Sequence, residues 1–207
     1  MRLPSAKKLH LVLSTRRIEA LSDGVFAIVM TLLILSFNII DPTSAELQQP
    51  LAERITSQWP AFLHFVESFV ILAYFWVKHH QQFHFINKSD QRILWLNLAG
   101  LMFICMIPFS TTVMTDYGND KIAALFFEGN MLAVGLIYHY EWIYATNKRR
   151  LVDKELDKSI IEFYKKINLL VPIISVVAII VSIFYARLGT GLYFLLPAIP
   201  IFAFRRR

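Results

Sequence analysis

Six long apolar stretches alternate with short charged segments along the chain. They cover residues 17–40, 59–80, 92–113, 122–144, 167–185 and 188–204. Each stretch approaches the roughly 20 apolar residues that an α-helix needs to cross a lipid bilayer. The pattern therefore predicts an all-α membrane protein with six transmembrane helices, in a single domain that spans residues 1–207.

The connections between these stretches differ in character. Only Ala186 and Arg187 separate the last two stretches, which predicts a tight helical hairpin. Residues 146–166 alternate basic and acidic side chains and end in an apolar run, so we expect an amphipathic helix that leads into the fifth span. Alternating charge of this kind is typical of a solvated helix face.

Composition and charge agree with a membrane protein and give its orientation. Hydrophobic residues make up 56% of the chain, and the mean hydropathy is +0.50. Suppose that the two termini, the connection between spans two and three and the connection between spans four and five share one side. That side then holds every lysine and arginine except Arg54, Lys121 and Arg187. This bias predicts that both termini lie in the cytoplasm.

The net charge of +6 follows from this topology, so no nucleic-acid partner is needed to explain it. The basic runs 148–150 and 205–207 favour membrane lipids with anionic headgroups instead. The single cysteine, Cys105, lies in the third span, which excludes a disulfide within one chain.

The first span carries polar residues near its N-terminal end. A carboxylate inside a membrane costs about 3 kcal/mol or more, so Asp23 is expected to have a dedicated partner. At about 100° per residue, Ile28 and Leu35 lie on one stripe with Arg17, while Leu32 and Thr31 lie on either side of it. Asp23 points about 120° away from Arg17. The helix therefore has one aliphatic face, and its carboxylate is expected to face other helices.

Partners for this carboxylate lie at matching depth on the second and third spans. The second span ends in a tryptophan and two histidines, and the third has an asparagine about one and a half turns after its start. We expect a polar network on the cytoplasmic side that supplies hydrogen bonds where water is scarce. Its members are Arg17, Ser22, Asp23, Trp76, His79, His80 and Asn97.

The same residues carry a family resemblance. Four segments together resemble motifs of the transmembrane protein 175 family of potassium channels. They are Arg17-x-x-x-Leu21-Ser22-Asp23, Trp76-x-x-His79-His80, Leu96-Asn97-Leu98 and Pro108-Phe109-Ser110-Thr111. This chain has Leu21 where the family usually has phenylalanine. The resemblance covers roughly residues 15–115, and the motifs are specific in combination.

The resemblance implies a potassium-permeable cation channel, not an enzyme, with no cofactor besides the permeant potassium ion. Bacterial members of this family have one six-helix repeat and assemble as homotetramers, with the first helices around a central pore. It also implies that Ile28, Leu32 and Leu35 form stacked constriction rings and that Thr31 tunes selectivity. The chain has no Thr-Val-Gly-Tyr-Gly filter, so selectivity would come from rings of side chains. The implied location is the plasma membrane.

Simpler interpretations of the first helix remain open. Every apolar helix has an aliphatic stripe, which can face lipid or a packed core. Arg17 can be a charge that extends to the membrane interface. The Thr31 hydroxyl can donate a hydrogen bond to its own backbone one turn earlier.

Two other protein classes also remain open. A small secondary transporter coupled to ions or protons would use intramembrane carboxylates, for which the candidates are Asp23, Glu67 and Glu128. A membrane di-iron enzyme would use clustered histidines, here His79, His80 and His84. Such sites need several separated clusters, and the chain has one.

Overall fold

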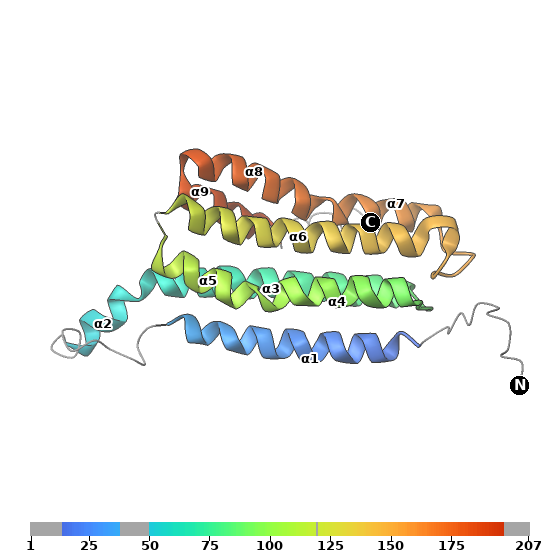
Figure 1. Cartoon of the computed structure of the whole chain (residues 1–207), viewed down its shortest axis with the longest axis horizontal. Helices are drawn as coiled ribbons and strands as arrows, with labels where there is room; N and C mark the ends of the chain where they lie inside the picture. The colour runs from blue at the N-terminus through green and yellow to red at the C-terminus, as the bar shows by residue number, and fades with distance from the viewer. Residues whose placement is uncertain (1–13, 38–49, 119, 197–207) are drawn as a thin grey trace, which may run out of the picture.

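The computed structural model describes residues 14–37, 50–118 and 120–196, and these residues form a helical bundle (Figure 1). Within these ranges, five helical segments are long and apolar enough to cross a membrane. They cover Arg16–Leu35, Trp59–Phe85, Gln91–Asp116, Lys121–Arg149 and Lys158–Phe184. The all-α membrane architecture is therefore confirmed, and the first five predicted spans are helical with shifted ends.

The helix nearest the N-terminus forms an outer layer of the bundle (Figure 1). It consists of α1 (Arg16–Leu32) and the 3-10 segment η1 (Leu33–Ser36). α1 packs on a middle layer formed by α3 (Trp59–Phe85), α4 (Gln91–Cys105) and α5 (Ile107–Asp116). The short helix α2 (Leu51–Ser57) precedes α3 at one end of the bundle. α1 therefore lies at an edge, with one side facing outward.

The other outer layer consists of α6 (Lys121–Thr146) and the segments that follow it (Figure 1). α7 (Lys158–Asn168) is the expected amphipathic helix, and it continues past Leu169 into α8 (Leu170–Phe184). α9 (Ala186–Thr190) turns back and packs against α8, as a hairpin requires. The 3-10 segment η4 (Gly191–Leu195) ends the described helices.

The α8–α9 hairpin is tight because of a glycine. A Cβ atom on Gly189 would clash with the Ser182 Oγ and the Glu128 Oε1. Glycine is therefore the residue that allows α9 to approach α6 and α8 this closely. The sixth predicted span, 188–204, is described only as far as residue 196; its remainder, both chain termini and residues 38–40 of the first span lie outside the described residues.

The third predicted span is not one continuous helix. It breaks between α4 and α5 at Met106, two residues before Pro108. Proline fits the first turn of a helix, where its missing N–H would have no partner, but not a helix interior. The hydroxyls of Ser110 and Thr111 donate to the Ile107 carbonyl at 2.9 and 2.8 Å. These bonds reinforce the first turn of α5.

Two buried clusters hold the layers together. The larger cluster joins α1, the middle layer, α6 and α8, and includes Phe75, Ile104 and Phe127. The smaller cluster lies where α3, α4, α6 and α7 meet, and is centred on Trp142. The Trp142 indole also donates a hydrogen bond of 3.1 Å to the Ile161 carbonyl, which ties α7 to α6.

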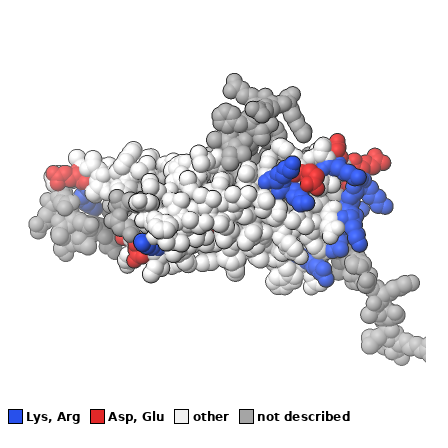
Figure 2. Space-filling view, turned by 90° about the horizontal axis from the view of Figure 1, so that it is seen from above, with Lys and Arg blue, Asp and Glu red and all other residues white. Residues whose placement is uncertain are grey.

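Charge is concentrated at the two ends of the bundle, while the central surface in view is uncharged (Figure 2). Basic residues gather at the end formed by the start of α1, the α3–α4 connection and the α6–α7 connection. We call this the basic end; it includes Arg16, Arg17, Lys88, Arg92, Lys148, Arg149, Arg150, Lys154 and Lys158. The opposite end carries Arg54 and Lys121 among the described residues. This distribution is the one expected of a membrane-spanning bundle.

Candidate functional site

α1 has two faces of different character. The buried face packs on the middle layer and consists of Ile18, Ser22, Phe26 and Val29. On the other face, Ile28, Leu32 and Leu35 leave 60%, 42% and 62% of their surface exposed. The aliphatic stripe expected from the sequence is therefore not part of the core of one chain. It is available to lipid or to a second copy of the protein.

Thr31 lies on the exposed face, between Ile28 and Leu32 along the helix. Its hydroxyl donates a hydrogen bond of 2.7 Å to the Ile28 carbonyl, one turn earlier. This is the backbone hydrogen bond of the simpler interpretation of Thr31, and it also fixes the orientation of the side chain. Because the proton is used by the backbone, the hydroxyl oxygen presents its lone pairs outward as an acceptor.

Asp23 has a dedicated partner on the second span. The Trp76 indole N–H donates a hydrogen bond of 2.9 Å to the Asp23 Oδ1. The Trp76 ring in turn stacks on His80, with 6.0 Å between ring centroids. Asp23 itself is exposed in the single chain. It therefore lies at the border between the two faces of α1 and contacts α3 through Trp76.

Ser22, the neighbour of Asp23, starts a second set of contacts inside the bundle. Its hydroxyl donates to the Asn97 Oδ1 at 3.4 Å, and the Asn97 amide lies 2.8 Å from the His79 Nε2. All three residues are buried. His79 also stacks on Phe83, with ring centroids 4.4 Å apart. The chain of contacts links α1 to α4 and α4 to α3.

Six of the seven side chains predicted for the polar network form two separate branches of contacts. An outer branch joins Asp23, Trp76 and His80, and an inner branch joins Ser22, Asn97 and His79. Arg17 is exposed and forms no ion pair within the described part of the chain. The two branches fix the rotation of α1 about its axis, which determines the face that it presents outward.

The histidine cluster does not converge on one point. His79 points into the bundle toward Asn97, His80 stacks on Trp76, and His84 lies edge-on to Phe85. No group of three or more metal-binding side chains lies together in the residues that the structure describes. The side chains are arranged for packing and hydrogen bonding.

Glu67 and Glu128 lie far along the bundle from this network, toward the end opposite the basic end. Glu67 is buried, with one oxygen 3.5 Å from the His64 Nδ1. Glu128 is fully buried and accepts a hydrogen bond from the Ser182 hydroxyl. Glu67 contacts a residue of its own helix, α3, and Glu128 links α6 to α8.

A further set of buried polar residues was not expected from the sequence. Lys78 belongs to the cytoplasmic connection in the charge count above, but the structure buries it within α3, with only 5% of its surface exposed. The other members are Gln82, Tyr138, Glu141 and Asn168, all buried. The available signal was their polarity inside otherwise apolar stretches.

A polar cap closes the basic end. Asp90 caps α4 by accepting hydrogen bonds of 3.0 Å from the backbone N–H groups of Arg92 and Ile93. The Tyr144 hydroxyl donates to the other carboxylate oxygen at 2.6 Å, and Arg150 lies over the Tyr144 ring. Partial burial alone would raise the pKa of Asp90, but these hydrogen bonds and the nearby Arg150 charge lower it below its ordinary value.

The similarity to known proteins includes the region that holds the polar network. The profile of the endosomal/lysosomal potassium channel TMEM175 family matches residues 17–108. A protein of Chamaesiphon minutus named as a potassium channel is 31% identical over 185 residues, which cover 88% of this chain and 91% of that protein. A protein of Streptomyces collinus named in the same way is 33% identical over 145 residues, which cover 68% of this chain and 69% of that protein.

The fold gives the same result. A crystal structure described as a lysosomal potassium-selective channel TMEM175 homologue from Chamaesiphon minutus superimposes with a TM-score of 0.79 at 30% sequence identity. The superposition covers 92% of this chain and 97% of that one. Sequence and fold agree over nearly the whole described bundle, and the chain therefore belongs to the TMEM175 channel family.

Proposed function

We propose that this chain is the subunit of a potassium-permeable cation channel in which four copies of α1 surround a central pore. Two relatives that match most of the chain are named as potassium channels, and the similar crystal structure is described as a potassium-selective channel homologue. The single observation that carries the pore assignment is the exposed aliphatic face of α1 at the edge of the bundle.

Symmetry converts this face into a conduction path. One helix cannot enclose an ion, whereas a cyclic assembly repeats each exposed residue as a ring. Ile28, Leu32 and Leu35 then form three stacked apolar rings at increasing distance from the basic end. Rings of branched aliphatic side chains dewet a narrow pore and so act as a gate. The four Thr31 side chains form one ring of hydroxyl oxygens, which can replace part of the hydration shell of a potassium ion.

The polar network serves as the anchor of this pore helix. The inner branch binds the buried face of α1 to α4 and α3, and the outer branch binds its border to α3. Hydrogen bonds on one side of α1 fix the direction of its other side. The exposed side chains of the four α1 copies then face the same central axis. In this role Asp23 positions the lining and does not contact the ion.

The same arrangement supports a membrane orientation. The basic end faces the cytoplasm, because positively charged connections are retained there. Both chain termini are then cytoplasmic, and a sixth span completes the bundle. Anionic lipid headgroups contact the basic end. With a single six-helix repeat, the location proposed is the plasma membrane of a bacterium.

A bilayer recording tests the function. Purified protein is reconstituted into planar bilayers with potassium on one side and sodium on the other. We expect unitary currents whose reversal potential is displaced toward the potassium equilibrium potential. A transporter that used Glu67 or Glu128 would turn over too slowly for unitary currents. Their absence at high protein density, with flux still measurable in vesicles, would contradict the channel assignment.

Native mass spectrometry in lipid nanodiscs tests the assembly. We expect the mass of four chains. Crosslinking through Cys105 is a weaker test, because one cysteine per chain joins at most two subunits. A single chain or a dimer as the largest species in nanodiscs would contradict the central pore.

A further inference from the structure

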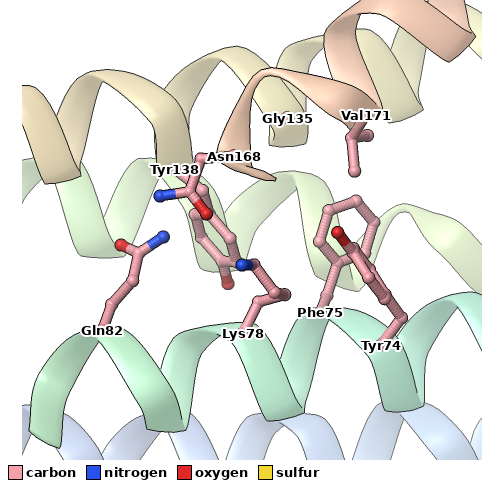
Figure 3. Close-up of a pocket in the computed structure, with 8 residues that line it drawn as sticks. All are labelled: Tyr74, Phe75, Lys78, Gln82, Gly135, Tyr138, Asn168 and Val171. Atoms are coloured by element: carbon pink, nitrogen blue, oxygen red, sulfur yellow. The ribbon is translucent and has the colours of Figure 1, made fainter. Parts of the chain in front are cut away.

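A small pocket lies between the middle layer and the α6–α8 layer, away from α1 (Figure 3). Its volume is about 10 Å³, which is room for about one water molecule. The pocket lies where α3 and α6 meet the junction between α7 and α8. It is lined by Tyr74, Phe75, Lys78, Gln82, Gly135, Tyr138, Asn168 and Val171.

The lining is polar on one side and apolar on the other. Figure 3 shows the ends of the Lys78, Tyr138 and Asn168 side chains directed toward one another, with the Gln82 amide beside them. Both polar atoms of the Gln82 amide, both of the Asn168 amide and the Tyr138 hydroxyl are buried without a hydrogen-bond partner. Unsatisfied buried polar groups are rare in folded proteins and indicate an occupant that supplies the missing bonds.

Lys78 makes this pocket electrostatically unusual. Only 5% of its surface is exposed. Among the described residues, no carboxylate lies within ion-pair distance of its amine. Its Nζ instead lies 5.0 Å from the centre of the Tyr164 ring, on the face that attracts cations. Burial without a counter-charge favours the neutral amine, so Lys78 keeps its charge here only if an anion lies beside it.

Glu141 on α6 is an alternative source of negative charge. It follows Tyr138 by three residues and interacts with it electrostatically. It is buried, and both of its oxygens lack a hydrogen-bond partner. It does not line the pocket and forms no ion pair with Lys78.

We propose that this pocket binds a small monovalent anion, of which chloride is the common cellular example. Four side chains supply donors around one space: the Lys78 ammonium, the amide N–H groups of Gln82 and Asn168, and the Tyr138 hydroxyl. A water molecule could accept some of these bonds but would leave the lysine charge uncompensated. The small volume favours a single-atom anion over a larger oxyanion such as phosphate. The bound anion joins α3 and α6 to the end of α7.

Bromide is a probe for this site, because it replaces chloride and gives an anomalous X-ray signal. The full chain, purified in gluconate, is titrated with bromide at constant ionic strength while thermal unfolding is followed. We expect the unfolding midpoint to rise by about 3–6 °C for each tenfold increase of bromide above its dissociation constant. Crystals grown in bromide should show an anomalous peak beside the Lys78 Nζ.

Two lysine variants separate this site from surface binding. Lys78→Met should remove the bromide dependence, whereas Lys166→Met, the same change at an exposed position of α7, should keep it. If both variants respond to bromide as the natural protein does, or if anomalous peaks occur only at the surface, the protein binds an adventitious ion only. Either result would overturn the proposal.

Two further variants keep the proposal testable if Lys78→Met does not fold. Asn168→Asp places a covalent negative charge in the pocket, so it should raise the unfolding midpoint in gluconate and abolish the response to bromide. Glu141→Gln should leave the response in place. If the natural protein ignores bromide and only Glu141→Gln responds, Glu141 is the counter-charge of Lys78 and the anion site does not exist.

Discussion

Asp23 connects the exposed face of α1 to the rest of the bundle through one hydrogen bond, from the Trp76 indole. Asp23→Ala leaves this N–H without its acceptor. Trp76 is 39% exposed in the single chain, so we expect a loss of about 1 kcal/mol per subunit. Native mass spectrometry should show less tetramer, while channels that still form keep their preference between potassium and sodium.

Asp23→Asn is the matched control, because its amide oxygen can still accept from Trp76. It should assemble nearly as well as the natural protein. Normal assembly of Asp23→Ala together with a changed ion preference would place Asp23 in the conduction path and remove its role as an anchor.

Asp90 makes a prediction about acid stability. Its pKa is lowered in the folded protein from an ordinary value of 3.8, so the charged carboxylate stabilises the fold. This contribution is complete above the ordinary pKa and disappears as the pH falls through the lower, folded value. Asp90→Asn keeps an N-cap acceptor but loses the charge. We expect it to lower stability at pH 7 by less than about 1 kcal/mol, since the site is partly exposed.

Thermal unfolding of the natural protein and Asp90→Asn across pH 2–7 measures this effect. The two midpoints should differ at neutral pH and converge in acid. A constant difference at every pH would mean that Asp90 acts through its geometry, with no contribution from its charge.

Single residues were predictable where a motif specified them. Ser22, Asn97 and either His79 or His80 were predicted as parts of a network around Asp23; in the structure Ser22, Asn97 and His79 contact one another, while Asp23 bonds to Trp76. Lys78 was counted with a connection because it lies near the end of an apolar stretch, where lysines often reach the interface. Only the position of α7 and α8 over α3 shows that it is enclosed.

At the scale of elements, the exposed face of α1 gives a prediction about permeation. Ile28→Asn would place a ring of amides where a dewetted ring is proposed. Each reduction of about 1.4 kcal/mol in the barrier raises a rate about tenfold, and we expect current to rise by at least this factor. Discrimination between potassium and sodium should weaken, as measured by the reversal potential in mixed solutions.

Ile180→Asn is the control for this change. Ile180 is similarly exposed, at 54% compared with 60% for Ile28, but it lies on α8 in the opposite outer layer. Phe26, across α1 from Ile28, is unsuitable because it is buried in the core. If Ile180→Asn changed permeation and Ile28→Asn did not, the pore-lining face would be wrongly assigned.

The positions of the helices were predictable from the sequence, but the break within the third span was not. Length and apolar composition are enough to locate five spans, because a bilayer sets a minimum helix length. The break at Met106 was not predicted, since both α4 and α5 are apolar and hydropathy does not detect it. Pro108, together with the hydroxyls that follow it, was the signal available in the sequence.

The whole molecule has two outer layers, α1 on one side and α6 with α8 on the other, and both expose apolar side chains. α8 exposes Ile173, Val176 and Ile180, much as α1 exposes Ile28 and Leu35. Side-chain hydrogen bonds hold the buried side of both helices. α1 differs because the Thr31 hydroxyl interrupts its exposed aliphatic face, which a lipid-facing helix does not need. The family match over residues 17–108 includes α1 and its polar partners but not α8, which favours α1 as the lining.

This assignment predicts how mixed assemblies behave. If each ring receives one residue from each of four subunits, co-reconstitution of the natural chain with Ile28→Asn should give channels that carry from none to four amides. Each amide added to the ring lowers the dewetting barrier further, so single-channel recordings should resolve intermediate conductance classes whose frequencies follow the mixing ratio. A pore contained within one chain would give only the two parental conductances at every ratio, and that outcome would exclude a shared central pore.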